Sequence, residues 1–301
     1  MRLRTLLPAT AALGAAAVGY TTVVERNWFA LRRFEIPVLP PGSPPLRVLH
    51  ISDAHLTPGR SRLMSWIRGL DDLDPHLVVN TGDSIAHPEA TRCFLDSLGP
   101  LLDRPGVFVF GSNDLHAPSL GNPLLYLRPG GSRGRSAKGA GLPWEKLRDG
   151  MVAGGWLDLN NHRGRLTAGG LNIAFGGVHD AHINRDRYEE VAGPADPAAA
   201  LRVAVMHTPE PRLLDRFAAD GYDLLLAGHT HGGQLCLPFY GTLVTNCGLD
   251  RERARGLHRH PVGGDAWLHV SAGLGTSPCA PARFACRPEA SLLTLVPRDS
   301  S

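Results

Sequence analysis

The stretch from Leu224 to Gly233 decides the fold; it reads Leu-Leu-Leu-Ala-Gly-His-Thr-His-Gly-Gly. Its four aliphatic residues predict a buried strand, because a short apolar run that ends at a turn signal is typical of one. The glycines that follow predict a tight turn, which would present both imidazoles, His229 and His231, at the end of that strand. Two imidazoles held in this way indicate a metal site more than a packing contact.

Four other segments repeat this pattern of an apolar run that ends in polar residues. Ile51 is followed by Ser-Asp-Ala-His, Asn80 by Thr-Gly-Asp, Phe110 by Gly-Ser-Asn-Asp, and Met206 by His. Because α/β sheets assemble their sites at the carboxyl ends of strands, we expect the side chains to converge. The candidate metal ligands are Asp53, His55, Asp83, Asn113, His207, His229 and His231.

The chain from residue 46 onward alternates short apolar runs with amphipathic segments, which is the pattern of a layered α/β domain. We expect one domain over residues 46–298. Strands are predicted at 47–51, 77–80, 107–110, 171–176, 202–206, 223–227, 267–270 and 292–296. Helices are predicted at 62–73, 91–102, 144–153 and 211–219.

The candidate ligands offer carboxylate, imidazole and amide groups and no thiolate. Such donors suit two divalent metal ions (Mn, Fe or Zn) better than a structural zinc, which normally uses cysteine. Seven ligands are too many for one open site, and Asp83 is the expected bridging carboxylate between two ions. Two cations roughly 3.5 to 4 Å apart can hold a bridging hydroxide and clamp a phosphoryl group, which predicts phosphoester hydrolysis. The same ligands also fit acyl or amide hydrolysis.

Taken in order, the five boxes resemble the calcineurin-like metallophosphoesterases, and the resemblance covers residues 46–295. It implies a four-layer αββα sandwich. It also implies one cation on Asp53, His55, Asp83 and His231, and the other on Asp83, Asn113, His207 and His229. The Gly232-Gly233-Gln234 extension and the apolar N-terminus look more like a bacterial subgroup of phosphodiesterases that act on membrane-linked or UDP-sugar-lipid substrates.

One box departs from the family, in which the usual run is Gly-Asn-His-Asp or Gly-Asn-His-Glu. Here the run is Gly111-Ser112-Asn113-Asp114, so either Ser112 or Asn113 is the ligand. We favour Asn113, because serine is a poor neutral ligand for such a cation. The catalytic candidates are Asp83, Asn113, Asp114 and His116, with Asp114, His116 and His182 as substitutes for the missing histidine. An alternative is a catalytically degenerate, membrane-linked binding module.

The N-terminus differs from the rest of the chain. Residues 5–24 carry no charge and are rich in alanine and leucine, which predicts a membrane anchor or an export signal. We therefore expect a membrane-associated protein that is otherwise cytoplasmic. Residues 25–45 are expected to be a linker, stiffened by the prolines from Pro37 to Pro45.

Net charge and cysteine content limit the classes of substrate and of structural site that we expect. The net charge of +3 gives no field that favours nucleic acid, so a phosphorylated small molecule or lipid is the expected substrate. Residues 115–150 form a predicted basic loop insertion that could guide an anion. The loop at residues 176–182 could approach the site, with Asp180 as a supporting residue. Five scattered cysteines fit neither a disulfide framework nor a zinc ribbon.

Overall fold

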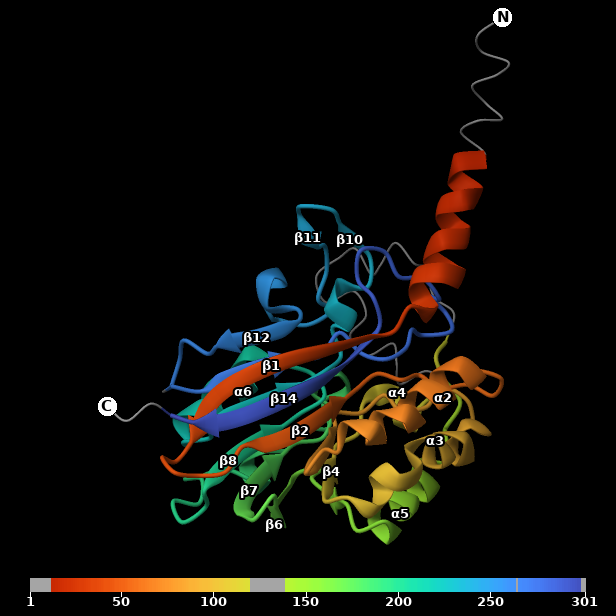
Figure 1. Cartoon of the computed structure of the whole chain (residues 1–301). Helices are drawn as coiled ribbons and strands as arrows, with labels where there is room; N and C mark the ends of the chain where they lie inside the picture. The colour runs from red at the N-terminus through yellow and green to blue at the C-terminus, as the bar shows by residue number, and fades with distance from the viewer. Residues whose placement is uncertain (1–11, 120–138, 264, 299–301) are drawn as a thin grey trace, which may run out of the picture.

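A computed structural model of the chain describes residues 12–119, 139–263 and 265–298. Two six-stranded sheets pack face to face, and helices cover their outer faces (Figure 1). The chain therefore adopts the layered α/β fold that the sequence predicts and the four-layer αββα sandwich that the family resemblance implies.

The first sheet has the strand order β1-β14-β2-β3-β4-β5. Only the pairing of β14 with β2 is antiparallel. The central strands are almost entirely buried, as expected where both faces of a parallel sheet are covered, and most of their residues are apolar. The strands are β1 (Ala30–Leu39), β2 (Leu46–Ile51), β3 (Leu77–Asn80), β4 (Gly106–Phe108), β5 (Leu157–Asp158) and β14 (Glu289–Pro297).

The second sheet has the order β12-β13-β9-β8-β7-β6. Its four inner strands are parallel, and the two edge strands are antiparallel to their neighbours. The strands are β6 (His162–Ala168), β7 (Leu171–Gly177), β8 (Leu201–Val205), β9 (Leu224–Ala227), β12 (Gly256–Arg259) and β13 (Trp267–Val270). A separate hairpin joins β10 (Cys236–Leu237) to β11 (Gly241–Thr242).

Three hydrophobic clusters hold the layers together. One lies between the sheets, a second packs α2, α3 and α5 on the first sheet, and a third packs α6 on the second. The helices are α2 (Ser61–Arg68), α3 (Ala90–Leu98), α4 (Ser112–Leu115), α5 (Trp144–Ala153) and α6 (Pro211–Ala219), and the single turns Gly69–Leu73 and Gly99–Asp103 continue α2 and α3. The helices predicted at 144–153 and 211–219 are confirmed to the residue.

The predicted linker is wrong over residues 30–39. These residues form β1, which pairs in parallel with β14 at the edge of the first sheet. Ile36, Val38 and Leu39 are buried between the sheets, so this segment belongs to the core. Pro37 is tolerated because an edge strand leaves one row of N–H groups unpaired.

Two other predicted segments lie partly outside the described residues. Residues 12–24 are helical and extend away from the sandwich (Figure 1). Among the described residues, no helix is both long and apolar enough to cross a membrane. Of the predicted basic insertion at 115–150, residues 120–138 fall outside the description. Its last part is not a loop, because α5 begins at Trp144 and packs Leu147 and Met151 into the core.

Candidate metal centre

The candidate ligands follow strands of both sheets. Asp53, Asp83 and Asn113 come after β2, β3 and β4 of the first sheet, and His207 and His229 come after β8 and β9 of the second. These parallel strands bring their carboxyl ends to one edge of the sandwich. Contacts described below connect all seven predicted ligands into one group.

Asp53, His55 and His231 form what we call the first cluster. The Nε2 atoms of His55 and His231 lie 3.0 Å apart, and His231 Nε2 lies 3.5 Å from Asp53 Oδ1. The two rings stack with centroids 4.9 Å apart. One ligand atom from each residue falls within 4.8 Å of the others, which is a spacing that one cation could occupy.

Asp83, Asn113 and His207 form the second cluster. Asp83 Oδ2 lies 3.5 Å from His207 Nε2 and accepts a hydrogen bond of 2.7 Å from the Asn113 amide. The same oxygen is 3.4 Å from Nε2 of His55, so Asp83 connects the two clusters. Asp53 also lies within reach of Asp83 and His207, so two carboxylates are placed between the imidazoles.

His229 lies beside both clusters. Its backbone N–H donates to Asp53 Oδ2 at 3.0 Å, and its ring centroid is 5.2 Å from that of His207. Ser112, the alternative ligand, is buried, whereas the Asn113 side chain contacts Asp83 directly.

The backbone of the turns is bent sharply to present these side chains. Asp53, His55, Asp83, His229 and His231 all have positive φ values, between 41° and 69°. Non-glycine residues rarely adopt this region, and such conformations concentrate at functional sites. The spacing of the boxes gave no indication of this strain.

Glycines let the turns approach one another. A Cβ atom at Gly228 would lie 2.0 Å from Ser52 Oγ and 2.6 Å from Asp53 Oδ2. A Cβ atom at Gly111 would lie 2.2 Å from Asp83 Oδ1. The glycines that flank the ligands in the sequence are therefore needed for close packing of the two sheets' turns.

Unpartnered buried atoms test whether the residues fit a cation. Asp53 Oδ1 and His207 Nε2 are buried and, among the described residues, accept or donate no hydrogen bond. Leaving such atoms unpaired is costly, and a cation between them would remove that cost. Burial lowers the pKa of His55 and His231 and brings that of His229 to about 3, so these rings are neutral and can offer a lone pair. The donor set therefore fits divalent metal.

His207 differs electrostatically from the other imidazoles. Burial alone would lower its pKa, but Asp83, Asp180 and Asp53 raise it to about 9. Its Nδ1 lies 2.7 Å from the carbonyl oxygen of Thr81. That hydrogen bond fixes the ring so that Nε2 faces Asp83, which is the orientation a metal ligand needs.

Asp114, one of the predicted substitutes for the missing proton donor, turns its carboxylate toward the backbone. Its two oxygens accept four N–H groups, from Asp83, Ser84, Ile85 and Gly111. Burial and the charge of Asp83 raise the pKa of Asp114 to about 7, while the backbone N–H groups favour the ionised form. Asp114 thus holds the loop that carries Asp83.

Two supporting residues were not found from the sequence. The Ser52 hydroxyl donates to Asp53 Oδ2 at 2.5 Å. The guanidinium of Arg283 is fully buried and donates to the carbonyls of His231, Ala272 and Gly275. Its Nη2 also lies 3.2 Å from His231 Nδ1. No local spacing connects Arg283 with His231, so only the fold reveals the contact.

The loop at residues 176–182 does approach the site, as the sequence suggests. The buried Asp180 accepts hydrogen bonds from the Thr208 hydroxyl and from the backbone of His182. The His182 ring centroid lies 4.8 Å from that of His229. In contrast, the half-buried His116 ring makes no hydrogen bond to either cluster among the described residues.

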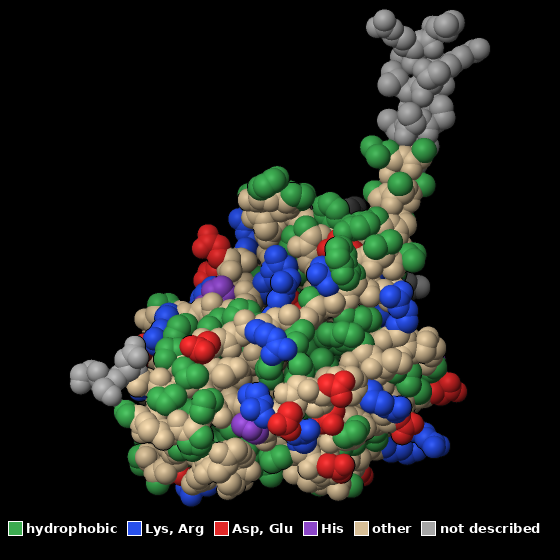
Figure 2. Space-filling view, viewed as in Figure 1, with side chains coloured by type: hydrophobic (Ala, Val, Ile, Leu, Met, Phe, Trp, Pro, Cys, Tyr) green, Lys and Arg blue, Asp and Glu red, His purple; other side chains and the backbone are tan. Residues whose placement is uncertain are grey.

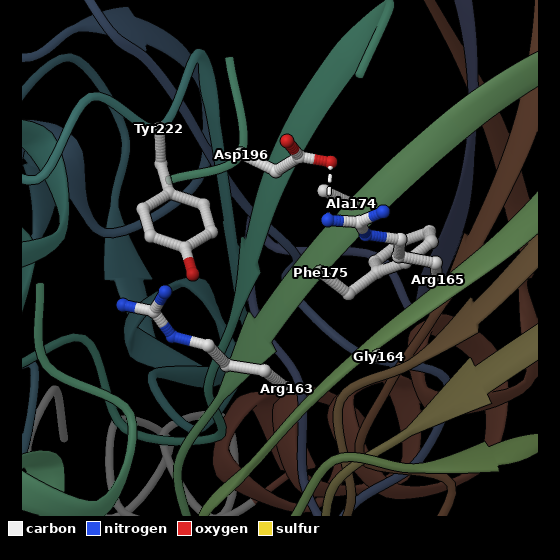
Figure 3. A pocket seen from close by; sticks show the side chains of 7 residues that line it. All are labelled: Arg163, Gly164, Arg165, Ala174, Phe175, Asp196 and Tyr222. Carbon is white, nitrogen blue, oxygen red and sulfur yellow. Dashed lines mark ion pairs between the residues drawn. The ribbon is translucent and has the colours of Figure 1, made fainter. Parts of the chain in front are cut away.

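A hollow at the far edge of the second sheet is not part of this site. Figure 3 shows Arg163 and Arg165 of β6 facing Tyr222 and Asp196 across it. Arg163 donates to backbone carbonyls of residues 191, 193 and 194, and Arg165 pairs with Asp196 at 2.8 Å. Because these cations already have partners, the hollow carries no functional assignment.

The chain is similar to several known proteins. Residues 46–233 match the family model of the calcineurin-like phosphoesterases. The chain is 27% identical to an uncharacterized metallophosphoesterase, YkuE of Bacillus subtilis, over 96% of this chain and 93% of that protein. It is 26% identical to the phosphodiesterase YaeI of Escherichia coli, over 97% of this chain and 98% of that protein. A solved 5′-nucleotidase precursor from Thermus thermophilus is 15% identical, with a TM-score of 0.44 over 83% of this chain and 55% of that one.

Proposed function

The chain belongs to the calcineurin-like phosphoesterase family and is a metal-dependent phosphoesterase; on that premise we propose that it uses two divalent cations to cleave a phosphodiester, phosphomonoester or pyrophosphate bond. The observation that carries the proposal is the pair of clusters joined by Asp83, whose Oδ2 lies 3.4 Å from His55 and 3.5 Å from His207.

The first cluster would hold one cation with Asp83, and the second cluster would hold the other with His229. When bound, such a pair supplies electrophilic stabilisation of a phosphoryl group and a nucleophile at neutral pH. Asp83 would bridge the pair. Asn113 now directs its amide nitrogen toward Asp83 at 2.7 Å, and a half-turn of the amide would direct its oxygen there instead.

His182 is our candidate for the proton donor that the family's usual histidine would provide. It is the one of the three sequence candidates whose ring contacts a predicted ligand, His229. The carboxylate of Asp114 accepts backbone N–H groups, and among the described residues the His116 ring makes no hydrogen bond or ring contact with a predicted ligand. A general acid contributes typically about 10² to 10⁴-fold, and most for a poor leaving group.

Substrates with different leaving groups test whether His182 donates a proton or has only a structural role. We expect His182→Gln to slow hydrolysis of an alkyl phosphodiester by about 10²-fold or more and to leave an aryl phosphodiester with an acidic leaving group much less affected. An equal loss on both substrates would assign His182 a structural role. The relationship to a protein named as a phosphodiesterase makes a phosphodiester the first substrate to test.

The function itself is tested by adding metal to purified protein. The full chain with Mn²⁺, Fe²⁺ or Zn²⁺ should hydrolyse an aryl phosphodiester or monoester, and Asp83→Ala should lower the rate by more than about 10³-fold. Asp96→Ala is the matched control, since Asp96 is an exposed carboxylate on α3. No turnover by the wild type with any of these ions and phosphate classes would favour the degenerate binding module. Membrane association through residues 5–24 remains a prediction.

A further inference from the structure

Exposed hydrophobic side chains are gathered on one face of the molecule. Within the described ranges, all the large hydrophobic residues that are exposed, apart from Val152 and Val262, lie in residues 12–28, in residues 235–240 or at Phe284. Figure 2 shows hydrophobic side chains along the N-terminal helix and over the hairpin of β10 and β11. We call these residues the apolar face.

Direct contacts make the apolar face continuous. The backbone N–H of Arg283 donates to the carbonyl of Thr21 at 3.0 Å, which fastens the N-terminal helix to the sandwich. The rings of Tyr20 and Phe284 lie 6.5 Å apart. Leu235 pairs with Phe284 in an isolated bridge, so the hairpin joins the same surface.

A cationic hollow opens within the apolar face. It measures about 400 Å³ and is lined by three arginines, Arg32, Arg255 and Arg287, and by one carboxylate, Glu25. Glu25 is buried and accepts a hydrogen bond of 2.7 Å from the backbone of Cys286. Arg32 pairs with Glu289, whereas Arg255 forms no ion pair with a described carboxylate. The hollow therefore has an excess of positive charge and a guanidinium that can receive an anion.

The hairpin tip presents two aromatic rings to solvent. Phe239 is fully exposed and sits at a φ of 67°, a conformation that bulky residues rarely adopt. Tyr240 is exposed as well, and Arg251 donates to its hydroxyl at 2.8 Å. Aromatic rings beside arginines are typical of surfaces that enter the lipid headgroup region.

We infer that the apolar face docks on a bilayer that contains anionic lipids. Phe239 and Tyr240 would enter the interface, and the hollow around Arg255 would receive a headgroup phosphate. A bilayer surface matches both the apolar and the cationic parts of the face. The hairpin follows His231 closely in the sequence, and the thiol of Cys236 donates to the carbonyl of Gly232. Docking would thus hold the metal centre close to the membrane, whether or not the centre is active.

Vesicle binding tests this inference without using turnover. The full chain should co-sediment with phosphatidylcholine vesicles that contain about 30% phosphatidylglycerol, and much less with phosphatidylcholine alone. Phe239→Ser with Tyr240→Ser should weaken partitioning by about tenfold or more. Arg255→Gln should weaken it by about fivefold, and that difference should shrink at about 0.5 M salt. Val262→Ser, an exposed residue elsewhere, is the matched control.

A second measurement separates the hairpin from the N-terminal residues. Lipids brominated on their acyl chains should quench added tryptophan fluorescence in Phe239→Trp and not in Val262→Trp. Binding that is unchanged by the hairpin substitutions would overturn the inference and assign any affinity to the N-terminus. The inference would also be overturned if the wild type bound neither kind of vesicle. In that case, a wild-type protein that self-associates and a double variant that does not would identify the apolar face as a protein interface. The Phe239, Tyr240 and Val262 variants should keep the wild-type melting temperature, because these side chains are exposed. Arg255 is half-buried, so the result for Arg255→Gln counts only if its melting temperature is also unchanged.

Discussion

The two clusters of the metal centre are built by different means. The first cluster is assembled from turns of both sheets that pack without room for a Cβ atom at Gly228. The second is held by one carboxylate, Asp114, which accepts three backbone N–H groups of the Asp83 loop and that of Gly111. The first cluster therefore depends on shape and the second on hydrogen bonding, which predicts that different substitutions will empty one without the other.

Removing Asp114 should have the largest effect. Asp114→Ala leaves four buried N–H groups without an acceptor, so we expect the free energy of unfolding to fall by about 3 kcal/mol or more. If the centre holds the two ions proposed above, metal content should fall from two per chain toward one, because the second cluster loses its support. Calorimetry and elemental analysis check both. Asp114→Asn keeps one acceptor oxygen and should fall between; equal stability of all three proteins would refute the role.

The reverse experiment disrupts the first cluster through its packing. In Gly228→Ala the added methyl group would collide with Ser52 and Asp53, at an expected cost of about 1–3 kcal/mol. In this variant we expect metal bound at the first cluster to be lost more readily than metal bound at the second. Gly221→Ala provides a comparison, since a Cβ at Gly221 meets no atom within 4 Å, although its φ of 88° adds some strain. Retention of both ions in Gly228→Ala would show that shape does not limit this cluster.

The smallest expected effect tests a single hydroxyl group. Ser52→Ala removes the hydrogen bond to Asp53 Oδ2 and leaves the backbone N–H of His229 as its remaining donor. Loss of such a supporting contact typically lowers metal affinity by about 10 to 100-fold. Titration with Zn²⁺ should show the change at one of two sites. An equal loss of metal affinity at both sites would mean that metal binding at one cluster depends on the other.

The sequence indicates which side chains converge better than it indicates what supports them. Strand ends followed by Asp or His predicted that Asp53, His55 and His207 would lie together, because parallel strands deliver their carboxyl ends to one edge. The sequence could not indicate that the Asp114 side chain turns back onto the Asp83 loop. Asn113 and Asp114 are adjacent, and the direction of each side chain depends on α4. Arg283 was missed because its contact with His231 exists only after the chain has folded.

The N-terminal strand was missed for another reason. Prolines near residues 37–45 favour a linker by composition, yet β1 carries Ile36 and Val38 into the space between the sheets. Local residue preference gives way here to long-range pairing with β14, which no short sequence window contains.

That pairing also sets the order in which the protein can be made. β14 lies between β1 and β2, so a strand that is synthesised long after both separates two that are synthesised early. Until residues 289–297 emerge, β1 lacks its neighbour in the sheet and one edge of β2 stays open, although Asp53 and Asp83 have already been synthesised. Contacts between such distant segments form slowly, and open edges invite aggregation. We therefore expect a nascent chain of this protein to be most prone to aggregation before residues 289–297 have emerged.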